Sequence, residues 1–175
     1  DWELASKKYA AMVHRIDQDT GRILALLDEL DITERTLVIF TSDNGGHSEF
    51  SGIFESSGPL RGFKRDLTEG GIRVPFIVRW PGFAPQAETS GEVIAVWDML
   101  PTFAELAGVE VSKGLDGSSV LEAFLGGERD TPLEFLYWDY GHCRDRYDQA
   151  VRMGGWKGIR LGVGTPVQLY NLTDD

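Results

Sequence analysis

The residues best suited to chemistry are an acid and an amide at the end of an apolar run. Residues 37–47 read Leu-Val-Ile-Phe-Thr-Ser-Asp-Asn-Gly-Gly-His, so Asp43 and Asn44 follow a segment of strand length. Their side-chain oxygens are hard donors suited to Ca²⁺ or Mg²⁺, and open α/β sheets place ligands just past the carboxyl ends of their strands. The pattern therefore indicates part of a metal site. The alternative is an Asp-Asn-Gly turn, because these residues also favour turns for local reasons.

A second chemical feature is a group of basic side chains in one short stretch. It contains four cations, Arg61, Lys64, Arg65 and Arg73. The whole chain is acidic, with 17 Lys and Arg against 28 Asp and Glu and a formal charge of −11. That balance argues against nucleic-acid and anionic-membrane binding, which need a basic surface, so an anionic substrate would need a local cluster such as this one. The alternative is a solvated segment balanced by Asp66 and Glu69.

Other common catalytic motifs are missing from the sequence. It holds no paired-cysteine zinc motif, no Gly-x-Ser-x-Gly elbow and no phosphate-binding glycine loop. The single Cys143 cannot form an internal disulfide. No run approaches the roughly 18 apolar residues of a membrane helix, so the sequence predicts a globular protein without a membrane span. On residue chemistry alone it indicates an α/β domain, with a divalent-cation site and a local turn both open as interpretations of Asp43 and Asn44.

The hydrophobic pattern predicts the elements that position these residues. Apolar residues recur every three or four positions over roughly residues 4–30, which predicts one long amphipathic helix. The charge-free run at 37–40 predicts a strand buried on both faces, as in a parallel sheet. Helix followed by such a strand is typical of α/β folds. Residues 45–63 are rich in Gly and Ser and lack periodicity, which predicts a functional loop.

The pattern changes near residue 130. Before it, we expect a strand at 76–80 and helices at 97–107 and 120–125; after it, short strands at 135–140, 149–153, 156–161 and 167–170. Successive short strands favour an antiparallel sheet. The sequence therefore predicts an α/β core in residues 1–130 and the start of a small antiparallel domain in residues 131–175. The first residues, from Asp1 on, show no signal segment, and the last residues read as a strand entering a turn. Both features suggest a piece of a longer protein.

Five segments match one known family in order and spacing. Residues 41–46 (Thr-Ser-Asp-Asn-Gly-Gly) match its calcium-binding segment, and residues 64–75 (Lys-Arg-Asp-Leu-Thr-Glu-Gly-Gly-Ile-Arg-Val-Pro) match its Lys-x-x-x-aromatic-Glu-Gly-Gly-x-Arg-x-Pro segment. Further matches lie at 97–108, 150–157 and 168–172. The chain thereby resembles the carboxyl-terminal portion of the sulfatases, in the alkaline-phosphatase superfamily. The resemblance implies part of a three-layer α/β/α core followed by a small antiparallel domain.

The resemblance also implies roles at individual positions. Asp43 and Asn44 would be two protein ligands of Ca²⁺, with Mg²⁺ as the other suitable ion. Lys64 would point its ammonium group at a sulfate oxygen and neutralise charge in the transition state. His47 lies in a loop that could reach substrate, or it makes an ordinary polar contact. Glu69 and Arg73 are expected to form an ion pair that supports the Lys64 loop.

The family nucleophile has no counterpart in this chain. It is a formylglycine made in a Cys/Ser-x-Pro/Ala-x-Arg motif, whereas Cys143 is followed by Asp145 and Tyr147 at the diagnostic positions. The nucleophile segment and two acidic metal ligands are therefore expected upstream of residue 1, and the isolated chain is expected to be inactive. Position 68, usually aromatic in the family, is Thr68.

The resemblance implies a sulfate ester as substrate, either a sulfated small molecule or a carbohydrate. Its specificity would depend on residues 45–63 and the segment around His142. The family favours a secreted, periplasmic or lysosomal location, while the oligomeric state is not predicted. Two alternatives stay open: a phosphonate or phosphodiester hydrolase of the same superfamily, and a non-catalytic module with an inherited fold.

Overall fold

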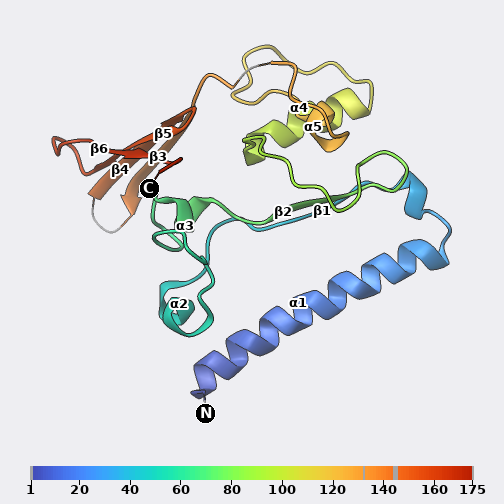
Figure 1. Cartoon of the computed structure of the whole chain (residues 1–175), viewed down its shortest axis with the longest axis horizontal. Helices are drawn as coiled ribbons and strands as arrows, with labels where there is room; N and C mark the ends of the chain where they lie inside the picture. Colours follow the sequence, from blue (N-terminus) through green and yellow to red (C-terminus); the bar gives the residue numbers. More distant parts are fainter. Residues whose placement is uncertain (1, 132, 144–145, 175) are drawn as a thin grey trace. The chain divides into compact units, whose positions relative to one another are not determined.

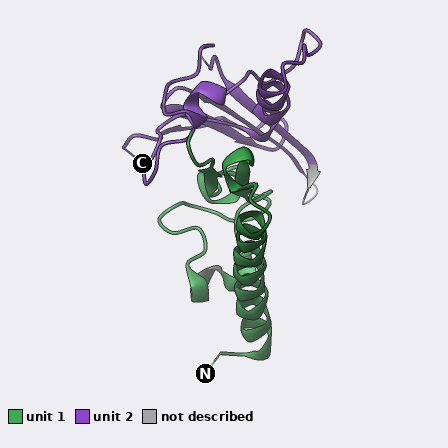
Figure 2. Ribbon diagram, turned by 90° about the vertical axis from the view of Figure 1, so that its right-hand side faces the viewer, with its two compact units in different colours: residues 1–82 green, residues 83–175 purple. Residues whose placement is uncertain are grey.

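The structure is a computed structural model that describes residues 2–131, 133–143 and 146–174, without the side chains of Ser51, His142 and Cys143 (Figure 1). By compactness the chain divides into two units, residues 1–82 and 83–175 (Figure 2), and each is described by itself. The predicted division between residues 130 and 131 concerns the domains of a whole protein and stays a prediction.

The first unit contains the predicted long helix and both predicted strands. Its elements are α1 (Leu4–Glu29), η1 (Thr33–Arg35), β1 (Val38–Thr41), α2 (Ser48–Phe54), α3 (Glu69–Ile72) and β2 (Phe76–Arg79). The strands β1 and β2 lie side by side in Figure 1. The apolar periodicity of α1 is confirmed as a helix, although much of its stripe is exposed, for example Met12, Ile16 and Ile23.

The expectation of a parallel strand buried on both faces is wrong. β1 pairs antiparallel with β2, from Val38 opposite Arg79 to Thr41 opposite Phe76, and Phe40 is 39% exposed. An apolar run reports a preference for burial, but the direction of pairing depends on which strand lies beside it. In the described chain that partner is β2, and no second layer covers Phe40.

The glycine- and serine-rich segment contains a helix that periodicity did not reveal. α2 occupies Ser48–Phe54, within the predicted loop of residues 45–63. Its aromatic side chains pack on the start of the chain: Phe50 stacks on Tyr9 of α1 at 4.5 Å, and Phe54 meets Trp2, just before α1, edge-on at 4.8 Å between ring centroids. Aromatic pairs contribute about 0.5–1.5 kcal/mol beyond area burial, so tertiary contacts stabilise a helix that its own glycine weakens.

The second unit carries the predicted antiparallel sheet. Its elements are η2 (Val96–Asp98), α4 (Met99–Leu106), α5 (Leu121–Phe124), β3 (Leu136–Cys143), β4 (Arg146–Met153), β5 (Trp156–Leu161) and β6 (Gln168–Asn171). The four strands follow one another in sequence order, each antiparallel to the next. The expected α/β fold with a small antiparallel sheet is therefore confirmed.

The two faces of this sheet differ. On one face, Lys157 is 1% exposed and its Nζ lies 5.3 Å from the Trp138 ring centroid, while Trp138 lies 6.1 Å from Trp97. On the other face, the Tyr147 hydroxyl donates to Asp139 at 2.5 Å. That hydrogen bond raises the pKa of the Tyr147 phenol, because ionisation would place two negative charges side by side.

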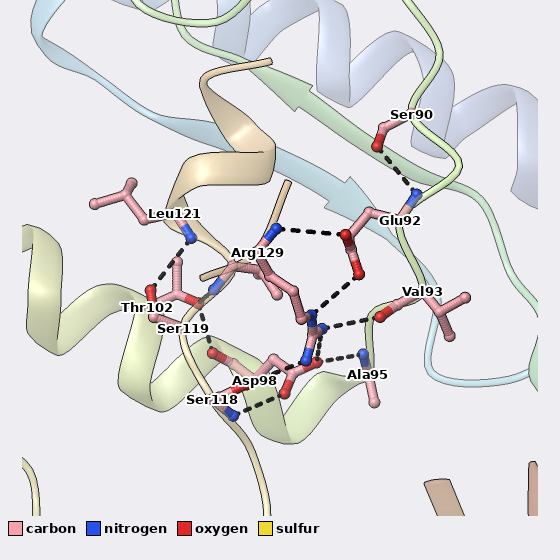
Figure 3. Close-up of polar contacts among 11 residues, drawn as sticks. Ser90, Glu92, Val93, Ala95, Asp98, Thr102, Ser118, Ser119, Leu121 and Arg129 are labelled. Atoms are coloured by element: carbon pink, nitrogen blue, oxygen red, sulfur yellow. Dashed lines mark hydrogen bonds and ion pairs between the residues drawn. The ribbon is translucent and has the colours of Figure 1, made fainter. Parts of the chain in front are cut away.

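A buried arginine organises the helical part of the second unit (Figure 3). The Arg129 side chain, 4% exposed, donates to Glu92 at 3.1 Å and to Asp98 at 3.1 Å. It also donates to the Val93 carbonyl at 2.9 Å and to Ser118 Oγ at 3.1 Å. Asp98 is 1% exposed and accepts the backbone N–H groups of Ala95 and Ser118 as well. Both charges are thus paired and hydrogen-bonded, as buried charges must be.

Among the residues that the structure describes, no helix combines the length and apolar character needed to cross a bilayer.

Candidate active site

The Asp43 loop presents two oxygen donors directly after β1. Asp43 is exposed, and Asn44 is half-buried. The Asn44 side-chain nitrogen donates to the Gly45 carbonyl at 3.0 Å, and Ser42 Oγ donates to the Asn44 carbonyl at 2.9 Å. Because the side-chain nitrogen of Asn44 is engaged in this hydrogen bond, its side-chain oxygen remains as the atom that can bind a cation. Both residues therefore offer hard oxygens of the kind that Ca²⁺ binds.

Backbone hydrogen bonds join this loop to the Lys64 loop. Gly45 N–H donates to the Gly71 carbonyl at 2.9 Å, and Lys64 N–H donates to the Gly46 carbonyl at 2.8 Å. A Cβ on Gly45 would lie 1.8 Å from the Gly70 oxygen, a distance that no real contact allows. Only glycine permits this approach. The structure therefore brings together the two segments that sequence analysis singled out.

The Lys64 loop is folded tightly on itself. A Cβ on Gly70 would lie 2.2 Å from the Gly62 oxygen, and one on Gly71 would lie 2.2 Å from the Asp66 oxygen. Asp66 accepts the Phe63 N–H at 3.0 Å. The acid that could have balanced surface charge instead holds the turn. In the sequence, the pair Gly70-Gly71 is the feature that indicates close packing, whereas nothing indicates the role of Asp66.

A serine from the long segment 45–63 also supports this loop. Ser57 Oγ lies within hydrogen-bond distance of the Gly62 carbonyl at 3.0 Å and of the Gly70 carbonyl at 3.3 Å. Sequence analysis missed this residue, because one serine among several in a polar segment carries no distinguishing pattern. Its contacts show that part of the predicted functional loop acts as a scaffold.

The predicted ion pair between Glu69 and Arg73 is present but long. Arg73 NH1 lies 3.9 Å from Glu69 Oε2, with the arginine side chain 64% exposed, so the pair contributes little. Thr68, where the family usually has an aromatic residue, leaves its Oγ1 buried without a hydrogen-bond partner in the described chain. A Cβ on Gly62 would lie 2.1 Å from that oxygen, so Thr68 packs directly beneath the turn.

His47 is engaged locally. Its Nδ1 accepts the Glu49 N–H at 3.2 Å at the start of α2, and its ring centroid lies 6.0 Å from that of Phe50. The imidazole is exposed, which leaves Nε2 available to a ligand. A substrate role for His47 stays a prediction.

The donor set fits calcium as part of a larger site. Within residues 2–131, 133–143 and 146–174, no group of three or more His, Cys, Asp and Glu side chains could hold a metal. Ca²⁺ takes six to eight oxygens, and Asp43 with Asn44 supplies two kinds of them. Across the same residues, no hydrogen bond or ion pair joins either side chain to Lys64. The side chains of His142 and Cys143, and the whole of Asp145, lie outside the described part of the chain.

Comparison with known proteins identifies the family. A sequence model of the sulfatase family matches residues 5–109, and a model of the carboxyl-terminal part of N-sulphoglucosamine sulphohydrolase matches residues 62–175. The chain belongs to the sulfatase family. The resemblance noted from the sequence motifs is thus confirmed. The steryl-sulfatase of Mus musculus is 38% identical to this sulfatase chain over 151 residues, covering 82% of this chain and 24% of the relative.

Solved structures agree with the sequence match. A crystal structure of Ps i-CgsB in complex with k-i-k-neocarrahexaose has a TM-score of 0.83 and 33% identity, covering 99% of this chain and 38% of that one. BT4656, solved with its substrate D-glucosamine-2-N,6-O-disulfate, has a TM-score of 0.80 and 24% identity, covering 95% and 34%, and this likeness shows the fold alone. This sulfatase chain spans about a quarter of the length of the mouse relative.

Proposed function

We propose that this chain forms part of a sulfatase that hydrolyses sulfate esters to an alcohol and inorganic sulfate. Asp43 and Asn44 would contribute two ligands to Ca²⁺, and Lys64 would bind a sulfate oxygen. The formylglycine nucleophile would come from residues outside these 175. The substrate class that we favour is a sulfated carbohydrate, because the Ps i-CgsB structure, at 33% identity, contains an oligosaccharide.

One observation carries the proposal: the Lys64 N–H donates to the Gly46 carbonyl at 2.8 Å. This bond holds the base of the lysine side chain beside the loop that carries Asp43 and Asn44. Negative charge builds up on oxygen as the bond to the alcohol breaks. Positive groups that are already fixed beside the sulfate stabilise this charge without reorganisation. No described residue forms a hydrogen bond or ion pair with the Lys64 ammonium or with the Asp43 carboxylate, so both are available to ligands.

The residues of this chain would act by binding and orientation. When bound, Ca²⁺ supplies positive charge that stabilises the sulfate oxygens. Lys64 would neutralise a further oxygen and favour departure of the alcohol, with water supplying the proton and the oxygen that the products require. The glycines at 45, 70 and 71 would hold the two loops at a fixed separation, which keeps the lysine close to the sulfate in every turnover.

The test uses the full gene product and p-nitrocatechol sulfate as substrate. Lys64→Ala should lower kcat/KM by about 100- to 1,000-fold, the usual loss when one preorganised donor to the transition state is removed. Lys113→Ala is the control, since Lys113 is an exposed lysine that lies outside the site, and it should leave kcat/KM unchanged. Calorimetry with CaCl₂ supplies a second readout, in which Asp43→Asn should weaken binding.

Each alternative predicts a different outcome. A phosphonate hydrolase would turn over a phenyl phosphonate ester faster than the aryl sulfate, and a non-catalytic module would turn over neither. Equal kcat/KM values for Lys64→Ala and Lys113→Ala would remove the role assigned to Lys64. The isolated 175-residue chain should be inactive, and turnover of the aryl sulfate by that chain would contradict a nucleophile located elsewhere.

A further inference from the structure

Arg65, the residue after Lys64, has an unusual backbone. Its φ is +79°, in the left-handed region that glycine enters freely and other residues seldom occupy. Gly62 in the same turn has φ +88°, so the turn already uses glycine where it needs this conformation. A side chain kept at a position where glycine would remove the strain points to a role for that side chain.

The charge around Arg65 is positive, although the chain is acidic. Asp66, its neighbour, faces inward and accepts the Phe63 N–H. Glu69 is only 13% exposed and faces Arg73 at 3.9 Å. Arg65 is exposed. Asp66 and Glu69 thus each have a partner other than Arg65, and the Arg65 side chain faces solvent.

The Arg65 guanidinium itself is available. No hydrogen bond or ion pair involves it among the residues that the structure describes, and the side chain is exposed beside Lys64. Consecutive Cα atoms lie about 3.8 Å apart, so the two side chains start from adjoining points of the backbone and one ligand with two anionic groups can reach both. Guanidinium presents a planar fork that matches a sulfate or carboxylate with two hydrogen bonds.

We propose that Arg65 binds a second anionic group, a sulfate or a carboxylate, on the same substrate whose ester group Lys64 contacts. This inference rests on the proposed function. It specifies that the preferred substrate carries at least two negative groups on one or adjoining sugar rings. Arg65 is a specificity residue in this scheme and takes no part in bond cleavage.

The test compares two sugars that differ by one sulfate, glucose 6-sulfate and glucose 2,6-disulfate. Each is measured as a competitor of p-nitrocatechol sulfate turnover by the full gene product. The disulfate should bind at least tenfold more tightly than the monosulfate, which corresponds to about 1.4 kcal/mol. Arg65→Gly should bring the two inhibition constants within twofold, while Arg65→Lys keeps part of the difference. Arg22→Gln removes one exposed cation from α1 and should leave the ratio unchanged.

Arg65→Gly is the informative variant because glycine accepts the left-handed backbone. Its melting temperature should be no lower than that of the parent. Arg65→Asn, which also tolerates this conformation, repeats the test if the glycine variant folds poorly. An unchanged ratio in both variants would overturn the proposal, as would equal weakening of both sugars. If the gene product hydrolyses no sulfate ester, the proposed function fails, and calorimetry with the same sugars still measures the ratio that tests Arg65.

Discussion

Backbone atoms hold the loops around Asp43 and Lys64 together, whereas charged side chains hold the segments around Arg129 together. In the first region, the joining bonds run between main-chain groups of Gly45, Gly46, Lys64 and Gly71. In the second, one guanidinium binds two carboxylates that lie 31 and 37 positions away in the sequence (Figure 3). The difference follows from what the side chains must do. Backbone groups and glycines join the two loops, which leaves the side chains of Asp43 and Lys64 available to meet a ligand.

Loss of one side chain should destabilise the network around Arg129 more than it destabilises the loops around Asp43 and Lys64. Arg129→Met leaves the buried Asp98 and the half-buried Glu92 without their partner, which should lower the free energy of unfolding by about 3–5 kcal/mol. Urea denaturation of the full gene product measures this change. Arg15→Met is the matched control, because Arg15 pairs with Asp19 at 3.0 Å but is 68% exposed, and it should change stability little.

A combined change separates the penalty of burying lone charges from loss of packing. Asp98→Asn and Glu92→Gln, added to Arg129→Met, should recover part of the lost stability, since no unpaired charge then remains. If Arg129→Met and Arg15→Met destabilise the protein equally, the network around Arg129 does not hold the unit together.

Addition of a side chain should disturb the loops around Asp43 and Lys64 more than it disturbs the network around Arg129. Gly45→Ala places a Cβ 1.8 Å from the Gly70 oxygen, so the two loops must separate. A displacement of about 1 Å at a site can cost about 100-fold in rate, and we expect at least that loss in kcat/KM for p-nitrocatechol sulfate. The measurement is steady-state kinetics on the full gene product.

Gly52→Ala is the matched control for the loop pair. A Cβ on Gly52 meets nothing within 4 Å, and its position inside α2 favours alanine by about 1 kcal/mol. This variant should keep full activity and melt at the same or a higher temperature. Equal activity of the two alanine variants would mean that the close approach at Gly45 has no bearing on catalysis.

Local pattern explains what could be predicted from the sequence. The periodic apolar residues of α1 and the successive short strands β3 to β6 were identified because their signal lies within a few neighbouring positions. α2 was missed because its stability depends on Tyr9 and Trp2, which lie 41 and 52 positions before their partners Phe50 and Phe54. The antiparallel pairing of β1 was missed because an apolar run carries no direction.

The two regions also differ in how far the sequence revealed their roles. The Asp43 and Lys64 segments stand out, since an acid, an amide and paired glycines next to an apolar run are rare in combination. In the sequence nothing distinguishes Asp98, because a single acid near the start of a helix is common and suits the helix dipole. Its true partner, Arg129, resembles any surface arginine in the sequence. Charges that pair across a long stretch of sequence produce no local sequence pattern, whereas two backbones that approach closely require glycine at the contact.

The smallest expected effect compares one buried hydroxyl in each region. Thr68 Oγ1, beneath the Lys64 turn, is buried without a hydrogen-bond partner in the part of the chain that the structure describes. Thr102 Oγ1, beside the Arg129 network, donates to the Asp98 carbonyl at 2.6 Å and accepts the Val120 N–H at 3.0 Å. Valine has a similar shape but no polar atom. Thr68→Val should therefore stabilise the protein by about 1 kcal/mol, since an unsatisfied buried group costs about 1–3 kcal/mol.

Thr102→Val should act in the opposite direction. It leaves the Val120 N–H without its acceptor and the Asp98 carbonyl without a donor, so stability should fall by about 1–3 kcal/mol. Parallel urea titrations of both variants give the two signs directly. A fall in stability for Thr68→Val as large as that for Thr102→Val would mean that the hydroxyl beneath the Lys64 turn is satisfied in the folded protein, and that it supports this loop as Thr102 supports the segments around Arg129.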